Sequence, residues 1–144
     1  MADPGQTAAL TSLLRVRTLA LDTARQELAQ RMDAEGLAEL EAQAADQAIV
    51  TEMNLASSVD ADDADVEAFA RWLPRGRARL AAAQAAAERA RADTVVARAG
   101  LAAAHSAARA VEDLLSQRHE EEYAEAAKRE QAALDDRPHR PPPA

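Results

Sequence analysis

Apolar residues recur every seven positions through the second half of the chain, from Leu73 to about Leu134. Two such rows, three positions apart, share one side of an α-helix because 3.5 residues per turn is close to the helix's own 3.6. The rows are Leu73, Leu80, Ala87, Thr94, Leu101, Ala108 and Leu115, and Gly76, Ala83, Ala90, Ala97, Ala104 and Val111. The pattern predicts a helix over about 74–135, on the order of 90 Å long, with a seam made mostly of alanine.

A second heptad series predicts a helix over about 7–56. It begins with Leu10, Leu14, Leu21 and Leu28. Gly36 interrupts the pattern, and we expect its phase to restart at Leu37, Leu40, Ala44, Ala48, Thr51 and Leu55. One glycine inside a helix costs only about 1 kcal/mol relative to alanine. We therefore expect one continuous helix with a soft spot.

The segment between these helices is expected to form an acidic turn over 57–65 (SSVDADDAD). Serine and aspartate favour turns because their side chains compete for backbone hydrogen bonds. Residues 65–73 fit a short amphipathic helix, and Pro74 suits the first position of the long helix that follows. Phe69 and Trp72 would then cover the tip as a hydrophobic cap, the alternative being a partner-binding role.

Folding back at this turn predicts an all-α, antiparallel two-helix coiled-coil hairpin over 7–135, in which paired residue numbers sum to about 130. This register sets Leu14 beside Leu115 and Leu28 beside Leu101, and it places acidic residues of the first helix along the arginines of the second. We expect the hairpin to be monomeric alone. Its seam residues are Leu10, Leu14, Leu21, Leu28, Leu73, Leu80, Leu101, Val111 and Leu115. Residues 1–6 are expected to be a disordered lead, and 136–144 (DRPHRPPPA) a proline-rich disordered tail.

Composition supports an extended helical protein rather than a globular one. Forty of the 144 residues are alanine and only three are aromatic, so the chain forms helix easily but cannot fill a large core. The net charge is −8, and residues 32–70 hold eleven acidic residues and no Lys or Arg. Such acidity argues against nucleic acid as the main partner, because phosphate binding needs clustered cations.

No constellation of residues indicates catalysis. His119 is followed four positions later by Tyr123 instead of the second histidine of a zinc-protease helix. The aspartates of 60–65 lack the glycine and the closing glutamate of a calcium loop. We expect no enzyme activity, no catalytic residue, no metal, no cofactor and no small-molecule substrate. No apolar run reaches a membrane span, and no secretory signal is expected at the amino terminus, so a cytoplasmic setting is expected.

Three segments resemble the FliJ family of flagellar type III export proteins. The opening, Leu10-x2-Leu13-Leu14-Arg15-Val16-Arg17-x4-Asp22-x-Ala24, is similar to the family's start. The closing half of the chain is similar to the family's ending, through Ala110-Val111-Glu112-x-Leu114-Leu115-x2-Arg118 and Lys128-Arg129-Glu130-Gln131-x2-Leu134-Asp135. The segment Trp72-Leu73-Pro74-Arg75-Gly76 is similar to alphaproteobacterial members. One departure is Asp136, which stands where the family pattern has glutamate.

The resemblance implies a non-enzymatic coiled-coil stalk and chaperone escort, similar to the central stalk of rotary ATPases. It implies as partners a hexameric export ATPase, an export-gate membrane protein and export chaperones. It also implies a place in flagellum biogenesis, motility and chemotaxis, in the cytoplasm and peripherally at the membrane of the flagellar base. The partner-binding residues that it suggests are Leu14, Arg15, Arg17, Asp22, Arg118, Arg129, Gln131, Leu134 and Asp135.

We further expect the end of the hairpin that holds both termini to enter the ATPase ring, because basic residues gather in these segments. They are Arg15, Arg17, Arg25, Arg109, Arg118, Lys128 and Arg129. Three alternatives stay open at this point: the stalk component of a virulence-type injectisome, a phasin-like granule-coating helical protein, and a structural coiled coil that dimerises through the same seam.

Overall fold

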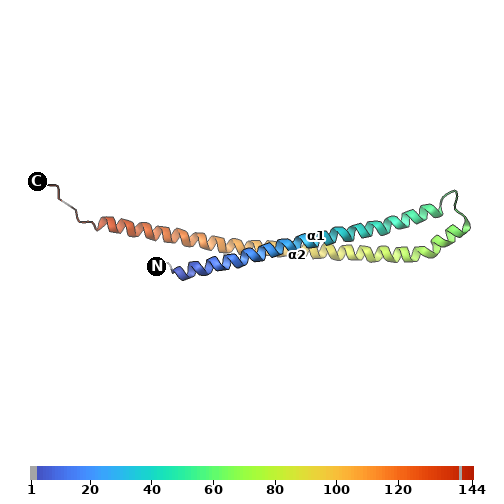
Figure 1. The fold of residues 1–144 in the computed structure, drawn as a ribbon, viewed down its shortest axis with the longest axis horizontal. Helices are drawn as coiled ribbons and strands as arrows, with labels where there is room; N and C mark the ends of the chain where they lie inside the picture. Colours follow the sequence, from blue (N-terminus) through green and yellow to red (C-terminus); the bar gives the residue numbers. More distant parts are fainter. Residues whose placement is uncertain (1–2, 140) are drawn as a thin grey trace. The chain divides into compact units, whose positions relative to one another are not determined.

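Two α-helices account for nearly all of the chain. The computed structural model describes residues 3–139 and 141–144, in which α1 spans Pro4–Ala56 and α2 spans Asp63–Asp135 (Figure 1). The described residues contain no strand. The expected fold class is thereby confirmed, since the two long helices pack against each other as a helical hairpin.

The amino-terminal helix begins earlier than the sequence predicted. Asp3 caps it, because its Oδ1 accepts a hydrogen bond of 3.0 Å from the Gly5 amide and its carbonyl oxygen accepts one from the Gln6 amide. Asp is among the best N-cap residues, and proline is favoured directly after the cap. The expectation of a disordered lead is therefore wrong for residues 4–6, which are helical, while residues 1 and 2 lie outside the described residues.

The turn between the helices ends in a reciprocal cap. The Asp65 amide donates to Asp62 Oδ1 at 2.9 Å, and the Asp62 amide donates to Asp65 Oδ2 at 3.0 Å. Two donors that the first helical turn cannot satisfy are bonded in this way. The acidic run thus starts α2 at Asp63, inside the segment that was predicted as turn.

Replacing Asp62 with alanine should lower the free energy of unfolding by about 1 kcal/mol, because the N-cap acceptor is lost. Asp60→Ala is the matched control, since it removes the same charge two residues away and Asp60 takes no part in the cap. Urea unfolding followed by circular dichroism measures both. Equal losses would show that the charge, and not the cap, matters.

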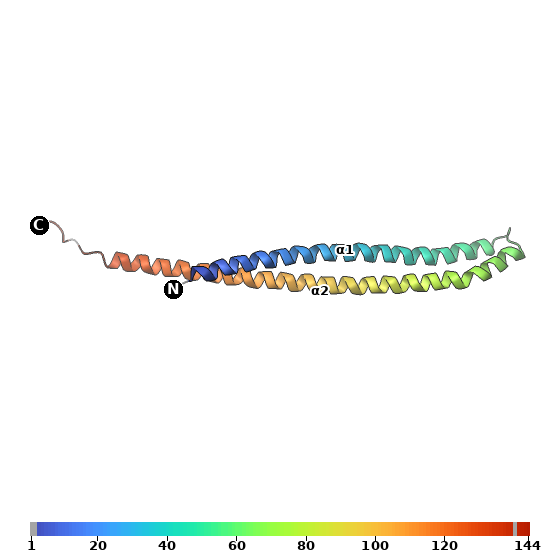
Figure 2. The ribbon, with the colours of Figure 1, turned by 60° about the horizontal axis from the view of Figure 1, so that its bottom comes forward.

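Pro74 lies inside α2, and this corrects the predicted division into a short helix over 65–73 and a second one from 74. A proline in a helix removes one hydrogen bond and crowds the preceding turn. The helix nevertheless continues, because Leu73 before the proline and Leu80 after it are half-buried in the seam and the Trp72 ring packs over Gly76. Figure 2 shows α2 bending in its first part, as expected of a proline-containing turn.

Packing divides the chain into two units, each with a segment of both helices. Unit 1 consists of residues 1–22 and 103–144, and unit 2 of residues 23–102. In unit 1, Ala108, Val111 and Leu115 of α2 are buried, and half-buried Leu10 and Leu14 of α1 lie on the contacting side. The remaining predicted seam leucines, in either unit, are half-buried: Leu21, Leu28, Leu73, Leu80 and Leu101.

Unit 2 packs through small side chains. Ala45 of α1 and Ala87, Thr94 and Ala97 of α2 are buried, and Figures 1 and 2 show the two helices side by side in this unit. Thr94 is only 1% exposed, and its hydroxyl lies 3.3 Å from the Arg31 carbonyl oxygen of α1 and 3.1 Å from that of Ala90. A polar group at a seam position favours one register over its neighbours.

The contacts between the helices lie within a few residues of the predicted register, with residue-number sums between 124, as for Arg31 and Asp93 and for Gln6 and Arg118, and 130. In unit 2, Arg91 Nε donates to Glu39 Oε1 at 3.0 Å, a pair whose residue numbers sum to about 130. In unit 1, Thr7 Oγ1 donates to Glu122 Oε1 at 3.0 Å, which gives nearly the same sum. Because the Arg91–Glu39 ion pair is exposed, it contributes no more than about 1 kcal/mol to the free energy of unfolding.

The predicted restart of the α1 phase at Gly36 is wrong. The inward positions continue the heptad of the first half, with Glu35, Ala38, Ala42 and Ala45 at least half-buried. Leu37 and Leu40 point outward, and Leu37, Leu40 and Leu55 are 60–65% exposed. Glycine adds no residue and leaves the helical period intact, and the alanines allow a closer approach to the alanine-rich seam of α2 than leucines would.

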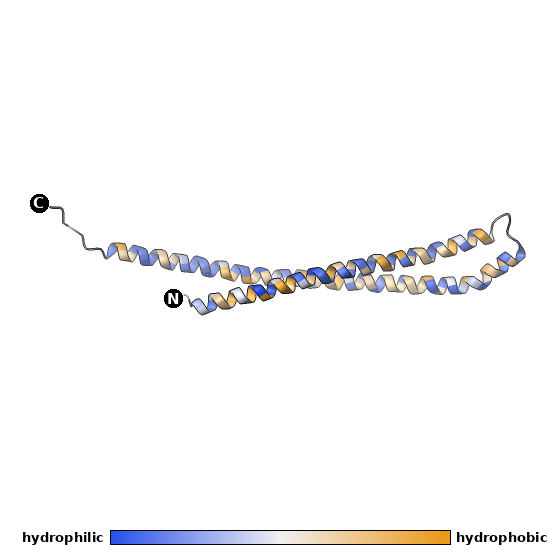
Figure 3. Cartoon of the chain, viewed as in Figure 1, coloured by the Kyte–Doolittle hydropathy of each residue, from blue (hydrophilic) through white to orange (hydrophobic). Residues whose placement is uncertain are grey.

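Apolar and polar residues mix along both helices (Figure 3). Over the described residues, neither helix offers a stretch long and apolar enough to cross a membrane.

Candidate functional site

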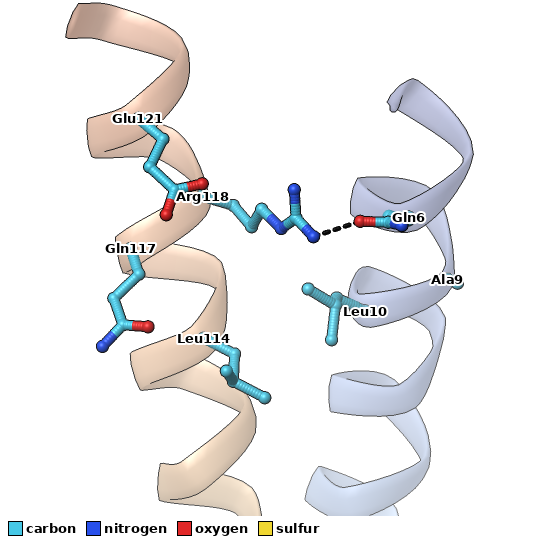
Figure 4. Close-up of a pocket in the computed structure, with 7 residues that line it drawn as sticks. All are labelled: Gln6, Ala9, Leu10, Leu114, Gln117, Arg118 and Glu121. Atoms are coloured by element: carbon cyan, nitrogen blue, oxygen red, sulfur yellow. Dashed lines mark hydrogen bonds between the residues drawn. The ribbon is translucent and has the colours of Figure 1, made fainter. Parts of the chain in front are cut away.

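The first candidate surface is a groove between the two helices of unit 1, with a volume of about 600 Å³. We call it the terminal groove. It is lined by Gln6, Ala9, Leu10, Leu114, Gln117, Arg118 and Glu121. The first turns of α1 supply three of these residues, and one stretch of α2 supplies the other four (Figure 4).

A charged and an amide side chain bridge this groove. The Arg118 guanidinium donates through Nη2 to Gln6 Oε1 (Figure 4). One turn further along α2, Glu122 accepts a hydrogen bond from the Thr7 hydroxyl group. Leu10 and Leu114 line the groove beside this bridge (Figure 4). The groove therefore combines an apolar floor with a positive and a negative group, a composition suited to a protein partner rather than to chemistry.

All nine predicted partner-binding residues lie in unit 1. Of these, only Arg118 lines the terminal groove. Leu14 is half-buried toward α2, whereas Arg15, Arg17 and Asp22 are exposed. The others are exposed on the last turns of α2, where Gln131 Nε2 donates to Asp135 Oδ1 at 3.2 Å: Arg129, Gln131, Leu134 and Asp135. Unit 1 thus brings together sequence segments about a hundred residues apart.

The sequence predicted a basic character for this end of the chain, but the net charge of unit 1 is negative. Unit 1 contains eight basic and eleven acidic residues. Acidic residues of α2, including the run Glu120, Glu121 and Glu122, lie among the basic residues that the sequence singled out, and Arg25 belongs to unit 2. Any preference for an anionic partner must come from individual arginines and not from the overall field of the unit.

A second candidate surface, which the sequence did not predict, lies where the chain turns in unit 2. We call it the tip cavity. It has a volume of about 520 Å³. Phe69 and Trp72, which the sequence suggested as a cap of the tip, line it and stack with their ring centroids 6.3 Å apart. The sequence contained one signal for this surface, the apolar residue Val59 in a turn of serines and aspartates. Val59 is fully exposed in the structure.

No arrangement in the described part of the chain resembles a metal site, since no three His, Cys, Asp or Glu side chains there lie together suitably. In the aspartate-rich turn, Asp62 and Asp65 are engaged in the cap of α2.

No known family model, curated protein or solved structure matches the chain. The two surfaces and the sequence resemblance are therefore the basis for a functional proposal.

Proposed function

We propose that this protein is a non-enzymatic component of the bacterial flagellar export apparatus, a stalk and chaperone escort that binds the export ATPase ring and couples it to the export gate. The observation that carries the proposal is the composition of unit 1. Two of the three segments that carry the family resemblance, the opening one from Leu10 to Asp22 and the closing one from Ala110 to Asp135, are parts of the same packed unit, whereas Trp72–Gly76 belongs to unit 2.

The geometry of unit 1 suits binding to a ring of subunits. Two helices give a narrow element, and the exposed side chains of Arg15 and Arg17 on α1 and of Arg129 on α2 can pair with acidic groups of a surrounding partner. The terminal groove adds an apolar contact through Leu10 and Leu114. Export chaperones and the gate protein are further proposed partners, in the cytoplasm and peripherally at the membrane of the flagellar base.

Charge reversal tests the assignment of ATPase binding to unit 1. Arg17→Glu combined with Arg118→Glu should weaken binding to the purified hexameric export ATPase of the same cell by about tenfold or more, because each close interfacial charge pair contributes on the order of 1.4 kcal/mol or more. A pull-down followed by a titration measures the loss.

The matched control reverses two charges in unit 2. Asp63→Lys combined with Glu67→Lys changes exposed carboxylates that take no part in the cap of α2, and it should leave ATPase binding unchanged. Circular dichroism confirms that both variants keep their helix. Equal weakening by the two pairs would refute the assignment to unit 1, and an absence of binding by the unaltered chain would refute the proposed function.

A further inference from the structure

The tip cavity of unit 2 has an apolar, aromatic floor that no other part of the described chain covers. Its apolar lining consists of Leu55 and Ala56 of α1, Ala61 of the turn, and Ala68, Phe69 and Trp72 of α2. Beside it, Val59 is fully exposed and Val66 is 50% exposed. An exposed cluster of this size on a polar protein is typical of an interaction site.

The aromatic floor is held in position by a glycine. A Cβ atom on Gly76 would lie 2.6 Å from Cη2 of Trp72, so the indole lies directly over the helix backbone one turn further on. Phe69 stacks against the indole at an interplanar angle of 30°. Because α2 fixes both rings, a partner side chain meets a formed surface and does not have to order one.

Three carboxylates, Glu52, Asp60 and Asp65, line the same cavity, and no basic residue does. Two more aspartates of the turn, Asp62 and Asp63, are exposed nearby in sequence. The aromatic floor therefore favours an apolar side chain of a ligand. The carboxylate rim, formed by Glu52, Asp60 and Asp65, favours cationic side chains around it.

We propose that the tip cavity binds a cationic amphipathic helical segment of a partner protein, with a leucine-sized or aromatic side chain as anchor on Phe69 and Trp72 and with Lys or Arg on the carboxylate rim. Helix-in-groove recognition uses this combination of anchor and charge. A second copy of this chain is disfavoured because the net charge is −8, and anionic lipid or nucleic acid is disfavoured by the same carboxylates. The inference concerns unit 2 alone and does not depend on binding of an ATPase by unit 1.

Trp72 makes the test direct, because it is the only tryptophan of the chain. The probe is a 14-residue amphipathic helical peptide of leucine and lysine, titrated into the full-length protein while tryptophan emission is followed. We expect a saturable change in emission. A peptide with glutamate in place of every lysine should leave the emission unchanged, and equal binding of the two peptides would overturn the proposal.

Two double variants with the same change in charge distinguish binding at the cavity from attraction by the overall negative charge of the protein. Glu52→Gln combined with Asp60→Asn should weaken binding of the lysine peptide by about tenfold, because two charge contacts of the cavity are lost. Glu41→Gln combined with Asp46→Asn, elsewhere in unit 2, should weaken it little. Equal weakening by both variants would show non-specific attraction.

Phe69→Ala provides the apolar arm of the test, and circular dichroism checks that its helix content is retained. It should weaken binding of the lysine peptide at least tenfold while Trp72 still reports the titration, and unchanged affinity would contradict an aromatic anchor site. A saturable peptide titration together with a failed ATPase pull-down would leave this inference standing and remove the proposed function. A failed peptide titration together with a successful ATPase pull-down would remove this inference and leave the proposed function standing.

Discussion

Replacing Gly36 and Gly100 together by alanine should raise the free energy of unfolding by about 2 kcal/mol. Both glycines lie inside helices, and a Cβ atom added at either position meets nothing within 4 Å. Alanine is favoured over glycine by about 1 kcal/mol in a helix interior, partly because glycine leaves the unfolded chain more freedom. The melting temperature should rise by about 3–4 °C per kcal/mol for a chain of this size.

Gly76→Ala should instead lower the free energy of unfolding. The new methyl group would collide with the Trp72 ring at 2.6 Å, so the indole must leave its position. We expect a net loss of about 1–2 kcal/mol, because the cost of overpacking exceeds the gain in helix propensity. Tryptophan emission should shift in this variant and stay unchanged in Gly36→Ala and Gly100→Ala.

Urea unfolding and thermal melts of the three single variants and the double variant give the complete comparison. If Gly76→Ala were as stabilising as Gly36→Ala, the indole could not lie over the backbone at residue 76. If the two stabilising changes failed to add, the two glycines would belong to one locally frayed region instead of acting independently.

The seam of α2 could be predicted from the sequence because nothing competes with its period. From Leu73 to Leu115 the heptad contains no insertion, and the many alanines among the intervening residues make helix the favoured local structure. The residues expected to face α1 are all at least half-buried in the structure, and Val111 and Leu115 are among the most buried. A long and uninterrupted pattern is the most dependable kind of sequence signal.

The phase of α1 beyond Gly36 could not be predicted by hydrophobicity alone. Between Gly36 and Ala45, Leu37 and Leu40 are the largest apolar residues, yet Ala38 and Ala45 face the other helix. Against a seam of alanine, close approach of the backbones gains more packing than two leucines held apart. Size, and not hydrophobicity, decides which face is buried there.

The candidate surfaces differ in how far the sequence could foresee them. The terminal groove follows from the hairpin fold, because Leu10 and Leu114 are brought near each other by the same pairing that joins Gln6 to Arg118. The tip cavity does not, because its lining comes from the end of α1, the turn and the start of α2, and because Pro74 was expected to end a helix that in fact continues.

Leu115→Asp should be the most damaging single change in the seam, with an expected loss of about 3–5 kcal/mol. Leu115 is 9% exposed and contributes to the buried side of unit 1 with Val111 and Ala108. The substitution removes the buried apolar side chain and places an unpaired carboxylate against the alanine seam, two costs that add. Such a loss is a large fraction of the stability of a chain of this length.

Leu114→Asp is the matched control, because the neighbouring leucine is 48% exposed and its new carboxylate would remain in water. We expect this control to lose no more than about 1 kcal/mol. Helicity at 222 nm and urea midpoints measured for both variants should therefore separate widely. Similar midpoints would mean that α2 does not present Leu115 to α1, and the heptad seam from which the hairpin was inferred would be assigned to the wrong face.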